Sequence, residues 1–306
     1  MMSGPLVSVI VPTHNRPALL RRAVTSALAQ TWDRIEVVVV DDGSTDATPE
    51  VTAELLAGDR RVRSLRNDTP AGGSAARNLG LDAAAGDVVA LLDDDDEWLP
   101  AKVERQLAHL DLRPYLGAVS CHHEIVDPGR PAPAVYRGPL EMTGDDLLWD
   151  NFAGSASFCL WRRSAFTTEP RFDPDLPSCQ DWDVWLQCAA AGPVEAVPEV
   201  LCRYGAHAGP RITGSAEARA AGRRRIIERY GDRMSAPCRA YNEARVALLE
   251  GDGAMAPLAA VVRRGPTVAW MVAAASVAGR RGDRAGDPGR GSRRLHELVR
   301  AAAVRA

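Results

Sequence analysis

Strands and helices alternate along the N-terminal third of this chain, and this alternation constrains the fold more than any other feature. Residues 7–11 (VSVIV), 36–40 (EVVVV) and 88–92 (VVALL) are short, nearly continuous apolar runs. Such runs are typical of strands that are buried on both faces of a parallel sheet. Segments with helical spacing lie between them, and Pro17 fits a first helical position. The pattern predicts an α/β fold with a mostly parallel sheet flanked by helices.

Polar residues follow three of these strands at the point where each strand ends. They are residues 13–15 (THN), 41–42 (DD) and 93–96 (DDDD). Ligands of parallel α/β sheets bind beyond the carboxyl ends of the strands. We therefore expect the three clusters to share one rim of the sheet.

The remaining elements are predicted from periodicity and from turn residues. Helices are expected over residues 48–57, 75–84 and 102–110, and strands over residues 61–65, 118–121 and 157–161. Residues 127–139 are rich in proline and glycine and are predicted to form a loop, whereas the chain from residue 216 onward is predicted to be mostly helical.

The four adjacent aspartates at residues 93–96 indicate a metal site. Carboxylates this close repel one another and are poorly tolerated without a cation. Their oxygens suit a hard divalent ion such as Mg²⁺ or Mn²⁺, to which a diphosphate can add further oxygen ligands. A single Asp-x-Asp is more often a solvated acidic turn, but four aspartates directly after a buried strand favour the metal site.

Composition and charge exclude several classes of protein. The 306 residues carry a formal net charge of −3, so no nucleic-acid partner is expected. The six cysteines form no Cys-x-x-Cys pair, and we expect them to be reduced core residues. We find neither a secretory leader nor an apolar stretch of about 20 residues, which predicts a cytoplasmic protein.

Five motifs occur in the order and at the spacing of one enzyme family. They are VSVIVPTHNR, EVVVVDDGSTDAT, GGSAARNLGLDAAAGD, LLDDDDEWLP and QDWDVWL. Together, over about residues 6–215, they resemble the inverting glycosyltransferases of family 2. The resemblance implies a GT-A fold, which is Rossmann-like, and transfer of a sugar from a nucleoside diphosphate sugar to an acceptor hydroxyl.

The resemblance also implies which residues bind the nucleotide-sugar. The matching set is Pro12, Thr13, Asn15, Asp42, Arg77, Asp93 and Asp94. Within that set, Asp42 would contact the base, and Arg77 would lie near the base and the phosphates. Uridine is favoured as the base by the resemblance, and thymidine and guanosine remain open.

The catalytic and metal-binding roles follow from the same resemblance. Asp95 would be the direct ligand of a Mn²⁺ or Mg²⁺ ion, and His207 matches a histidine that can approach the metal or the diphosphate. Asp181 matches the general base, and Asp183, two residues later, is the competing candidate.

Two stretches depart from the family pattern on the acceptor side. The family usually has Glu-Asp where this chain has Gln180-Asp181, so a neighbouring charge is missing. The family's Gly-x-Phe-Asp-Glu stretch is replaced here by residues 171–175 (RFDPD). An unusual acceptor site is therefore expected, for a small-molecule, glycan or lipid-linked acceptor.

The predicted domain organisation follows the extent of the resemblance. Residues 1–215 would form the catalytic domain, with a nucleotide-sugar-binding half (1–100) and an acceptor-binding half (101–215), and residues 216–306 a helical, arginine-rich C-terminal region with a mobile segment near 279–291. This region has two open interpretations. It is either a helical cap with arginines on its solvent-facing side, or an amphipathic contact with the inner face of a membrane through Trp270 and Met271.

Three other functions fit the sequence less well than sugar transfer. A nucleotidyltransferase would normally carry a glycine-rich phosphate loop after its first strand, where this chain has PTHNRP. A non-catalytic sugar-nucleotide or glycan-binding module would be expected to lack Asp95 or Asp181, and both are present. A processive polysaccharide synthase would carry membrane helices and a Gln-x-x-Arg-Trp motif, and neither is found. The oligomeric state cannot be predicted from the sequence.

Overall fold

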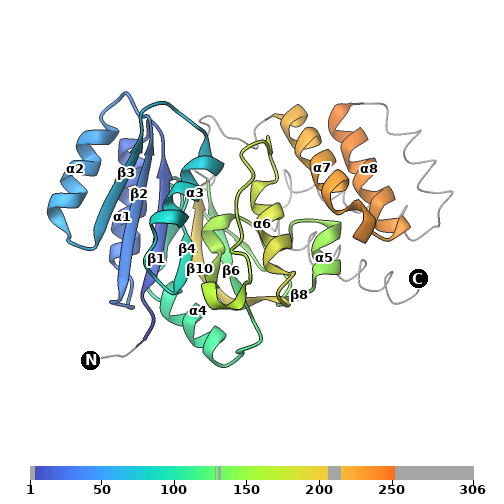
Figure 1. Ribbon diagram of the computed structural model, residues 1–306, viewed down its shortest axis with the longest axis horizontal. Coiled ribbons are helices and arrows are strands. Elements are labelled where there is room, and N and C mark those ends of the chain that lie inside the picture. Colours follow the sequence, from blue (N-terminus) through green and yellow to red (C-terminus); the bar gives the residue numbers. More distant parts are fainter. Residues whose placement is uncertain (1–3, 128, 130–131, 206–214, 252–306) are drawn as a thin grey trace.

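The computed structural model describes residues 4–127, 129, 132–205 and 215–251. A central sheet is covered by helices on both faces, and two further helices pack beyond one end of the sheet (Figure 1). His207, Trp270, Met271 and the predicted mobile segment at 279–291 lie outside the described residues.

Ten strands of the described chain form one sheet in the order β3-β2-β1-β4-β9-β6-β10-β5, with β7 paired to β6 and β8 paired to β10. The strands are β1 (Val7–Thr13), β2 (Ile35–Asp42), β3 (Val62–Asn67), β4 (Val88–Leu91), β5 (Glu97–Trp98), β6 (Ala118–Val126), β7 (Ala134–Tyr136), β8 (Glu141–Met142), β9 (Leu160–Arg162) and β10 (Val194–Gly205).

The first half of the sheet is parallel, and the second half is mixed. Strands β3, β2, β1 and β4 pair with one another in parallel, and β6 pairs in parallel with β10. Strand β9 runs antiparallel between β4 and β6, and so joins the two parallel parts. The predicted α/β fold is confirmed, with antiparallel strands added beyond β4.

Eight α-helices and three 3-10 turns accompany the strands in the described residues. The helices are α1 (Pro17–Leu28), α2 (Thr48–Gly58), α3 (Gly73–Ala83), α4 (Lys102–Asp111), α5 (Gly144–Trp149), α6 (Gln180–Cys188), α7 (Ala216–Tyr230) and α8 (Ala236–Glu250). The 3-10 turns are η1 (Ala156–Phe158), η2 (Arg163–Ala165) and η4 (Gly231–Arg233).

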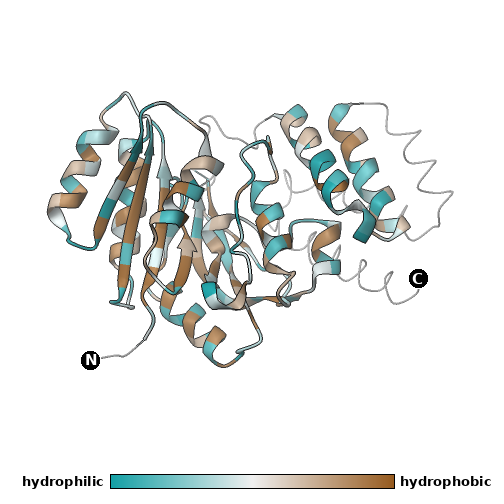
Figure 2. Cartoon of the chain, viewed as in Figure 1, coloured by the Kyte–Doolittle hydropathy of each residue, from teal (hydrophilic) through white to brown (hydrophobic). Residues whose placement is uncertain are grey.

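Alternating residues of the buried strands supply two separate cores. Ile10, Val38 and Val40 face the core shared with α3, α5, α6, α7 and α8. Val9 and Val39 face the opposite core, which includes residues of α1 and α4. Figure 2 shows the strongly hydrophobic strands between helices that are more hydrophilic on their outer sides. Every residue of β1 and β2 is buried, as their continuous apolar runs predict.

A close approach between α3 and the sheet depends on Gly80. A Cβ placed on Gly80 would lie 2.4 Å from Cγ2 of Ile10 in β1. Because only glycine permits this approach, it fixes α3 and its side chains against the strands whose ends carry the polar clusters.

Two local predictions are wrong. Residues 157–161 were expected to form one strand, but η1 occupies 156–158 and β9 begins at Leu160. The Ser155 hydroxyl accepts a hydrogen bond from the amide of Ser157, and this cap favours a turn at that point. Residues 127–139 were expected to be a loop, but they contain β7, whose pairing with β6 gives its backbone hydrogen-bond partners despite the flanking prolines and glycines.

Other predictions are confirmed for the described residues. All six cysteines are free, and five of them are buried. Helices α7 and α8 confirm the helical start of the C-terminal region and pack on each other. Within the described chain, no helix has both the length and the hydropathy that a membrane crossing requires.

Candidate active site

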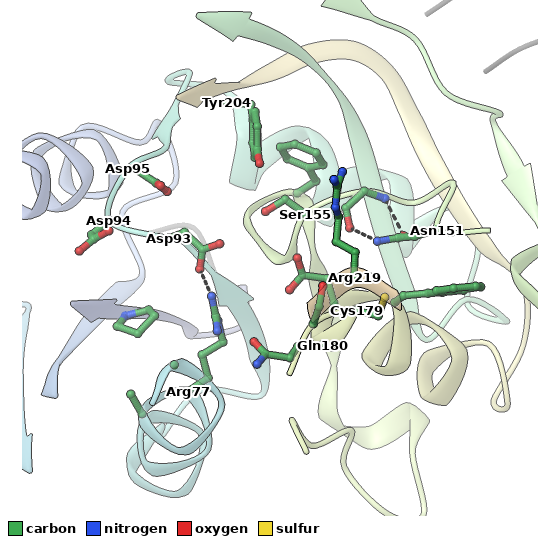
Figure 3. Close-up of a pocket in the computed structure, with 18 of the residues that line it drawn as sticks. Arg77, Asp93, Asp94, Asp95, Asn151, Ser155, Cys179, Gln180, Tyr204 and Arg219 are labelled. Atoms are coloured by element: carbon green, nitrogen blue, oxygen red, sulfur yellow. Dashed lines mark hydrogen bonds and ion pairs between the residues drawn. The ribbon is translucent and has the colours of Figure 1, made fainter. Parts of the chain in front are cut away.

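A cavity of about 1180 Å³ opens at the carboxyl ends of β1, β2 and β4, and extends to α6, α7 and α8 (Figure 3). Residues of all three predicted clusters line it, among them Thr13, Asn15, Asp42 and Asp93. The predicted convergence of the three strand ends on one rim is therefore present, because parallel strands place their carboxyl ends at the same edge.

The two aspartates at the end of β2 have different surroundings. Asp41 pairs with Arg66 and accepts a hydrogen bond from the amide of Ser44 at 2.9 Å, and it does not line the cavity. Asp42 lines the cavity, and its carboxylate accepts hydrogen bonds from the amides of Ala71 and Gly72 at 2.8 and 2.7 Å. Asp42 therefore holds the start of α3 at the rim, in addition to any contact with a base.

The loop after β1 is held by short hydrogen bonds to the other two strand ends. The Oδ1 atom of Asn15 accepts a hydrogen bond from the amide of Thr45 at 2.8 Å, and Thr13 donates one to Asp94 at 2.8 Å. Arg16 pairs with Asp94 at 2.9 Å and with Asp95 at 3.4 Å. Asp94 is thus held by this loop, and burial is the first cause that raises its pKa to about 6.

Three of the four consecutive aspartates form a compact acidic cluster. One carboxylate oxygen from each of Asp93, Asp95 and Asp96 lies within 4.8 Å of the others. Asp96 is fully buried, and its Oδ2 atom has no hydrogen-bond partner in the described part of the chain. The cluster offers three oxygen ligands at a spacing that fits a hard divalent ion.

The turn that carries this cluster packs tightly against the end of β10. The amide of Gly205 donates a hydrogen bond to Oδ1 of Asp96 at 3.0 Å. A Cβ on Gly205 would lie 2.1 Å from the backbone oxygen of Asp95. Gly205 is therefore needed for the position of the acidic turn.

Arg77 projects from the second turn of α3 toward the acidic cluster. Its Nη2 pairs with Asp93, and its guanidinium lies over the ring of Phe172, 5.1 Å from the ring centroid. Arg77 is only 7% exposed, and its Nε and Nη1 atoms have no hydrogen-bond partner among the described residues. Buried N–H donors without acceptors are costly, which suits a group that binds an anionic ligand.

Asp181 faces the cavity from the first turn of α6. Burial, and then the negative charge of Asp93, raises the pKa of Asp181 to about 6, against the opposing effect of Arg77. The preceding Cys179 has φ +65°, a left-handed conformation that non-glycine residues rarely adopt. After this turn, both Gln180 and Asp181 line the cavity, and Gln180 can be followed in Figure 3.

Asp183 faces the other way and is fully buried. Its carboxylate accepts hydrogen bonds from Tyr230 at 2.8 Å, from Gln187 at 2.8 Å and from Arg229 at 2.9 Å. Asp183 therefore ties α6 to α7 and does not line the cavity.

Aromatic side chains form another part of the cavity wall. The ring of His123 stacks between Tyr136 and Phe158, with centroid distances of 4.8 and 4.1 Å, and Tyr204 approaches edge-on. All four rings line the cavity. Burial lowers the pKa of His123 to about 3, so this ring is neutral at physiological pH and belongs to an uncharged aromatic wall.

Several residues of the acidic cluster and of the cavity wall are not identified by the sequence alone. Asp96 belonged to a recognised run but was not singled out as a ligand, and Arg16 belonged to the first motif. The aromatic rings come from four separate segments, so no linear pattern groups them. The helical-cap interpretation places the arginines of the C-terminal region on the solvent-facing side. Arg223 of α7 is instead only 6% exposed and lines the cavity, because Asp150 pairs with it there at 2.7 Å.

The sequence is similar to known glycosyltransferases. The family model described as Glycosyl transferase family 2 matches residues 8–168, just over half of the chain. The chain is 30% identical over 188 residues to the putative teichuronic acid biosynthesis glycosyltransferase TuaG of Bacillus subtilis strain 168. The matched stretch covers 61% of this chain and 73% of TuaG. Another curated relative, 40% identical, is matched over only 42% of its own length.

Two solved structures share the fold. The 1–349 part of S. aureus TarS, in complex with UDP-GlcNAc, matches with a TM-score of 0.64 at 18% identity, over 97% of this chain and 92% of that one. The mannosyltransferase PcManGT of Pyrobaculum calidifontis, in complex with GDP-Man and Mn²⁺, matches with a TM-score of 0.59 at 22% identity, over 98% and 86%. These similarities confirm the predicted GT-A fold.

Proposed function

The chain belongs to glycosyl transferase family 2, and from this premise we propose that it transfers a sugar from a nucleoside diphosphate sugar to an acceptor hydroxyl with inversion of configuration. In this proposal residues 1–100 bind the donor, residues 101–215 bind the acceptor, and Asp181 is the general base.

One observation carries the proposal: Asp181 and two members of the acidic cluster, Asp93 and Asp95, line the same cavity from different elements. Asp181 is close enough to Asp93 for that charge to raise its pKa. A base and a diphosphate-binding group on one cavity are what a single in-line displacement requires, because both reactants must be held together.

The donor site is assigned to the rim formed by β1, β2, β4 and α3. The nucleotide lies along Pro12, Thr13, Asn15 and Asp42, and the diphosphate lies beside Arg77. Arg77 supports this assignment because its Nε and Nη1 donors lack partners in the described chain. The start of α3 at Gly73 also lines the cavity, where backbone N–H groups favour phosphate oxygens.

A divalent cation fits the acidic cluster. Asp93, Asp95 and Asp96 bring three oxygens together, and Asp96 has an unpartnered buried oxygen within the described residues. Mn²⁺ or Mg²⁺ bound there would offset the charge on the departing diphosphate. His207 remains a proposed additional ligand from its motif alone.

In the proposed reaction, Asp181 accepts the proton of the acceptor hydroxyl while that oxygen attacks the anomeric carbon of the sugar. The bond between this carbon and the diphosphate oxygen breaks, and the nucleoside diphosphate leaves with the bonding electrons. Asp181 suits this role because a pKa of about 6 leaves it ionised at neutral pH yet basic enough to accept a proton.

Donor and acceptor classes are proposed from the similar proteins. The solved structures bind UDP-GlcNAc and GDP-Man, and TuaG is named for teichuronic acid biosynthesis. We propose a UDP-sugar as the first donor to test, a GDP-sugar as the second, and an acceptor hydroxyl on a glycan or lipid-linked glycan.

The released product tests this function. The protein is incubated with UDP-GlcNAc, UDP-glucose or GDP-mannose and Mn²⁺, with a pool of glycan acceptors, and the nucleotide products are separated by anion-exchange chromatography. Release of the nucleoside diphosphate from one donor is expected. In a parallel incubation with UTP and GlcNAc 1-phosphate, release of pyrophosphate would instead indicate a nucleotidyltransferase. Absence of turnover in both incubations, with measurable binding of a donor, would indicate a non-catalytic binding module.

A further inference from the structure

Helices α7 and α8 place arginines on the cavity wall beyond Asp181. Arg219 and Arg223 of α7 and Arg245 of α8 all line the cavity. Figure 3 shows Arg219 on the far side of Gln180 from Arg77 and Asp93. The cavity therefore has a second group of cations, separate from the arginine assigned to the donor.

The direction of Arg223 is fixed by three contacts. Its guanidinium pairs with Asp150 at 2.7 Å, donates a hydrogen bond to Asn242 at 2.5 Å, and lies 4.6 Å from the ring centroid of Trp182. The helix itself lies close to the chain that leads into α6, since a Cβ on Gly222 would lie 2.5 Å from the backbone oxygen of Ser178. Helix α7 is therefore held firmly against the acceptor half.

Helical spacing aligns the other two arginines with this fixed group. Arg219 precedes Arg223 by four residues and so lies on the same face of α7. Arg245 follows Asn242, the partner of Arg223, by three residues on α8 and shares its face. Two helices thus present three guanidinium groups to one part of the cavity.

The negative charge nearby does not balance these arginines. Asp150 is the carboxylate that pairs with Arg223, and its charge also interacts with Arg245. No carboxylate pairs with Arg219 or Arg245 in an ion pair within the described residues. Three cations beside one carboxylate leave a net positive subsite at the end of the cavity away from the metal-binding aspartates.

We propose that Arg219 and Arg245 bind an anionic group, a phosphate or a carboxylate, carried by the acceptor. This inference rests on the proposed function, because only that function makes the bound molecule an acceptor. Arg223, neutralised by Asp150, positions the two helices, whereas Arg219 and Arg245 contact the anion through guanidinium N–H donors that match its oxygens. The acceptor hydroxyl then lies between this subsite and the sugar donor, beside Asp181.

Matched ligands test the charge preference directly. The full chain is saturated with UDP and Mn²⁺, and ligand-observed NMR titrations measure the dissociation constants of phenyl β-glucoside, its 6-phosphate and phenyl β-glucuronide. The two anionic glycosides should bind at least about tenfold more tightly than the neutral one, since hydrogen bonds to charged groups are the stronger ones. The tighter of the two identifies phosphate or carboxylate as the preferred anion.

Variants show whether these arginines cause the preference. The double variant Arg219→Gln/Arg245→Gln should lose the preference but bind UDP as the wild type does. The control Arg225→Gln removes an exposed arginine of α7 that pairs with Glu228 and does not line the cavity, and it should keep the preference.

Three results would overturn the inference: equal binding of neutral and anionic glycosides, no binding of either anionic glycoside, or a preference that survives in the double variant. A failure of UDP to bind, with the arginine-dependent preference intact, would instead contradict the donor site and leave the anion subsite standing.

Discussion

Asp181 and Asp183 lie two residues apart in α6 but face in opposite directions, one into the cavity and the other into the contact with α7. The sequence alone leaves both as candidates for the general base. The hydrogen bonds of Asp183 to Tyr230, Gln187 and Arg229 occupy its carboxylate, whereas Asp181 is positioned to meet a ligand.

The isosteric pair Asp181→Asn and Asp183→Asn should therefore separate catalysis from stability. Asp181→Asn should lower kcat by about 10²- to 10⁴-fold, with little change in the thermal midpoint, because only a proton acceptor is lost. Asp183→Asn should lower the thermal midpoint by roughly 2–8 °C, since a buried carboxylate bonded to Arg229 and Tyr230 is replaced. Steady-state kinetics and thermal unfolding of both variants check this; the reverse pattern would assign the base to Asp183.

The pH dependence of the reaction should follow the ionisation of Asp181. Its pKa is raised to about 6, first by burial and then by Asp93. The ionised form is the one that can act as the proposed base. We expect kcat/KM to fall as the pH falls through about 6. A carboxyl group with a raised folded-state pKa favours the folded protein as it protonates, so unfolding at this group cannot cause the loss. A profile that stays flat from pH 7 to pH 5 would remove Asp181 from the role of base.

Metal binding should depend on the acidic cluster and not on its neighbour Asp94. Mn²⁺ should raise the thermal midpoint of the wild type, because an ion that binds only the folded state stabilises it. Asp95→Asn and Asp96→Asn should abolish most of that increase. Asp94→Asn is the matched control, since Asp94 is held by Thr13 and Arg16. If Asp96→Asn behaves like the wild type, the ion is not bound by Asp96.

The position of the acidic turn should matter as much as its carboxylates. Gly205→Ala places a Cβ against the backbone oxygen of Asp95, and should weaken Mn²⁺ binding by roughly tenfold although every ligand remains. Gly58→Ala is the control, because a Cβ on Gly58 has no neighbour within 4 Å. Titration of Mn²⁺ by calorimetry compares the two, and equal affinities would show that the turn tolerates displacement.

Arg77 should contribute to nucleotide affinity through the geometry of its guanidinium. Arg77→Lys keeps the positive charge but loses the forked N–H donors, and should weaken binding of the nucleoside diphosphate by about ten- to a hundredfold. Arg105 is exposed, pairs with Glu199 and does not line the cavity. The control variant Arg105→Lys should therefore leave the nucleotide affinity unchanged. If Arg77→Lys and the wild type bind the nucleoside diphosphate equally well, Arg77 contributes to binding through its charge alone.

The parallel part of the fold was predictable because its signals are local. The apolar runs of β1, β2 and β4 and the proline at the start of α1 are visible in the sequence, and parallel pairing then fixes where their ends meet. Asp42 and Asp93 could be placed on the rim for that reason. The strand β9 was misplaced because a cap on Ser155 decides where it begins.

The half of the chain that we propose to bind the acceptor was less predictable, because its part of the cavity wall is built from distant segments. His123 and Tyr204 lie 81 positions apart in the sequence, on β6 and β10, but their rings meet edge-on. Arg223 lies on an arginine-rich helix, and its burial depends on tertiary contacts with Asp150, Asn242 and Trp182. Contacts of this kind depend on tertiary packing and leave no periodic pattern.

The most direct test of the account is a calorimetric titration with UDP, GDP and dTDP, each with and without Mn²⁺, on the wild type and on Asp95→Ala. We predict that one nucleotide binds the wild type in the presence of Mn²⁺, and that Asp95→Ala loses this metal-dependent binding. Binding of no nucleotide under any metal condition would contradict the donor site, and with it the proposed sugar transfer.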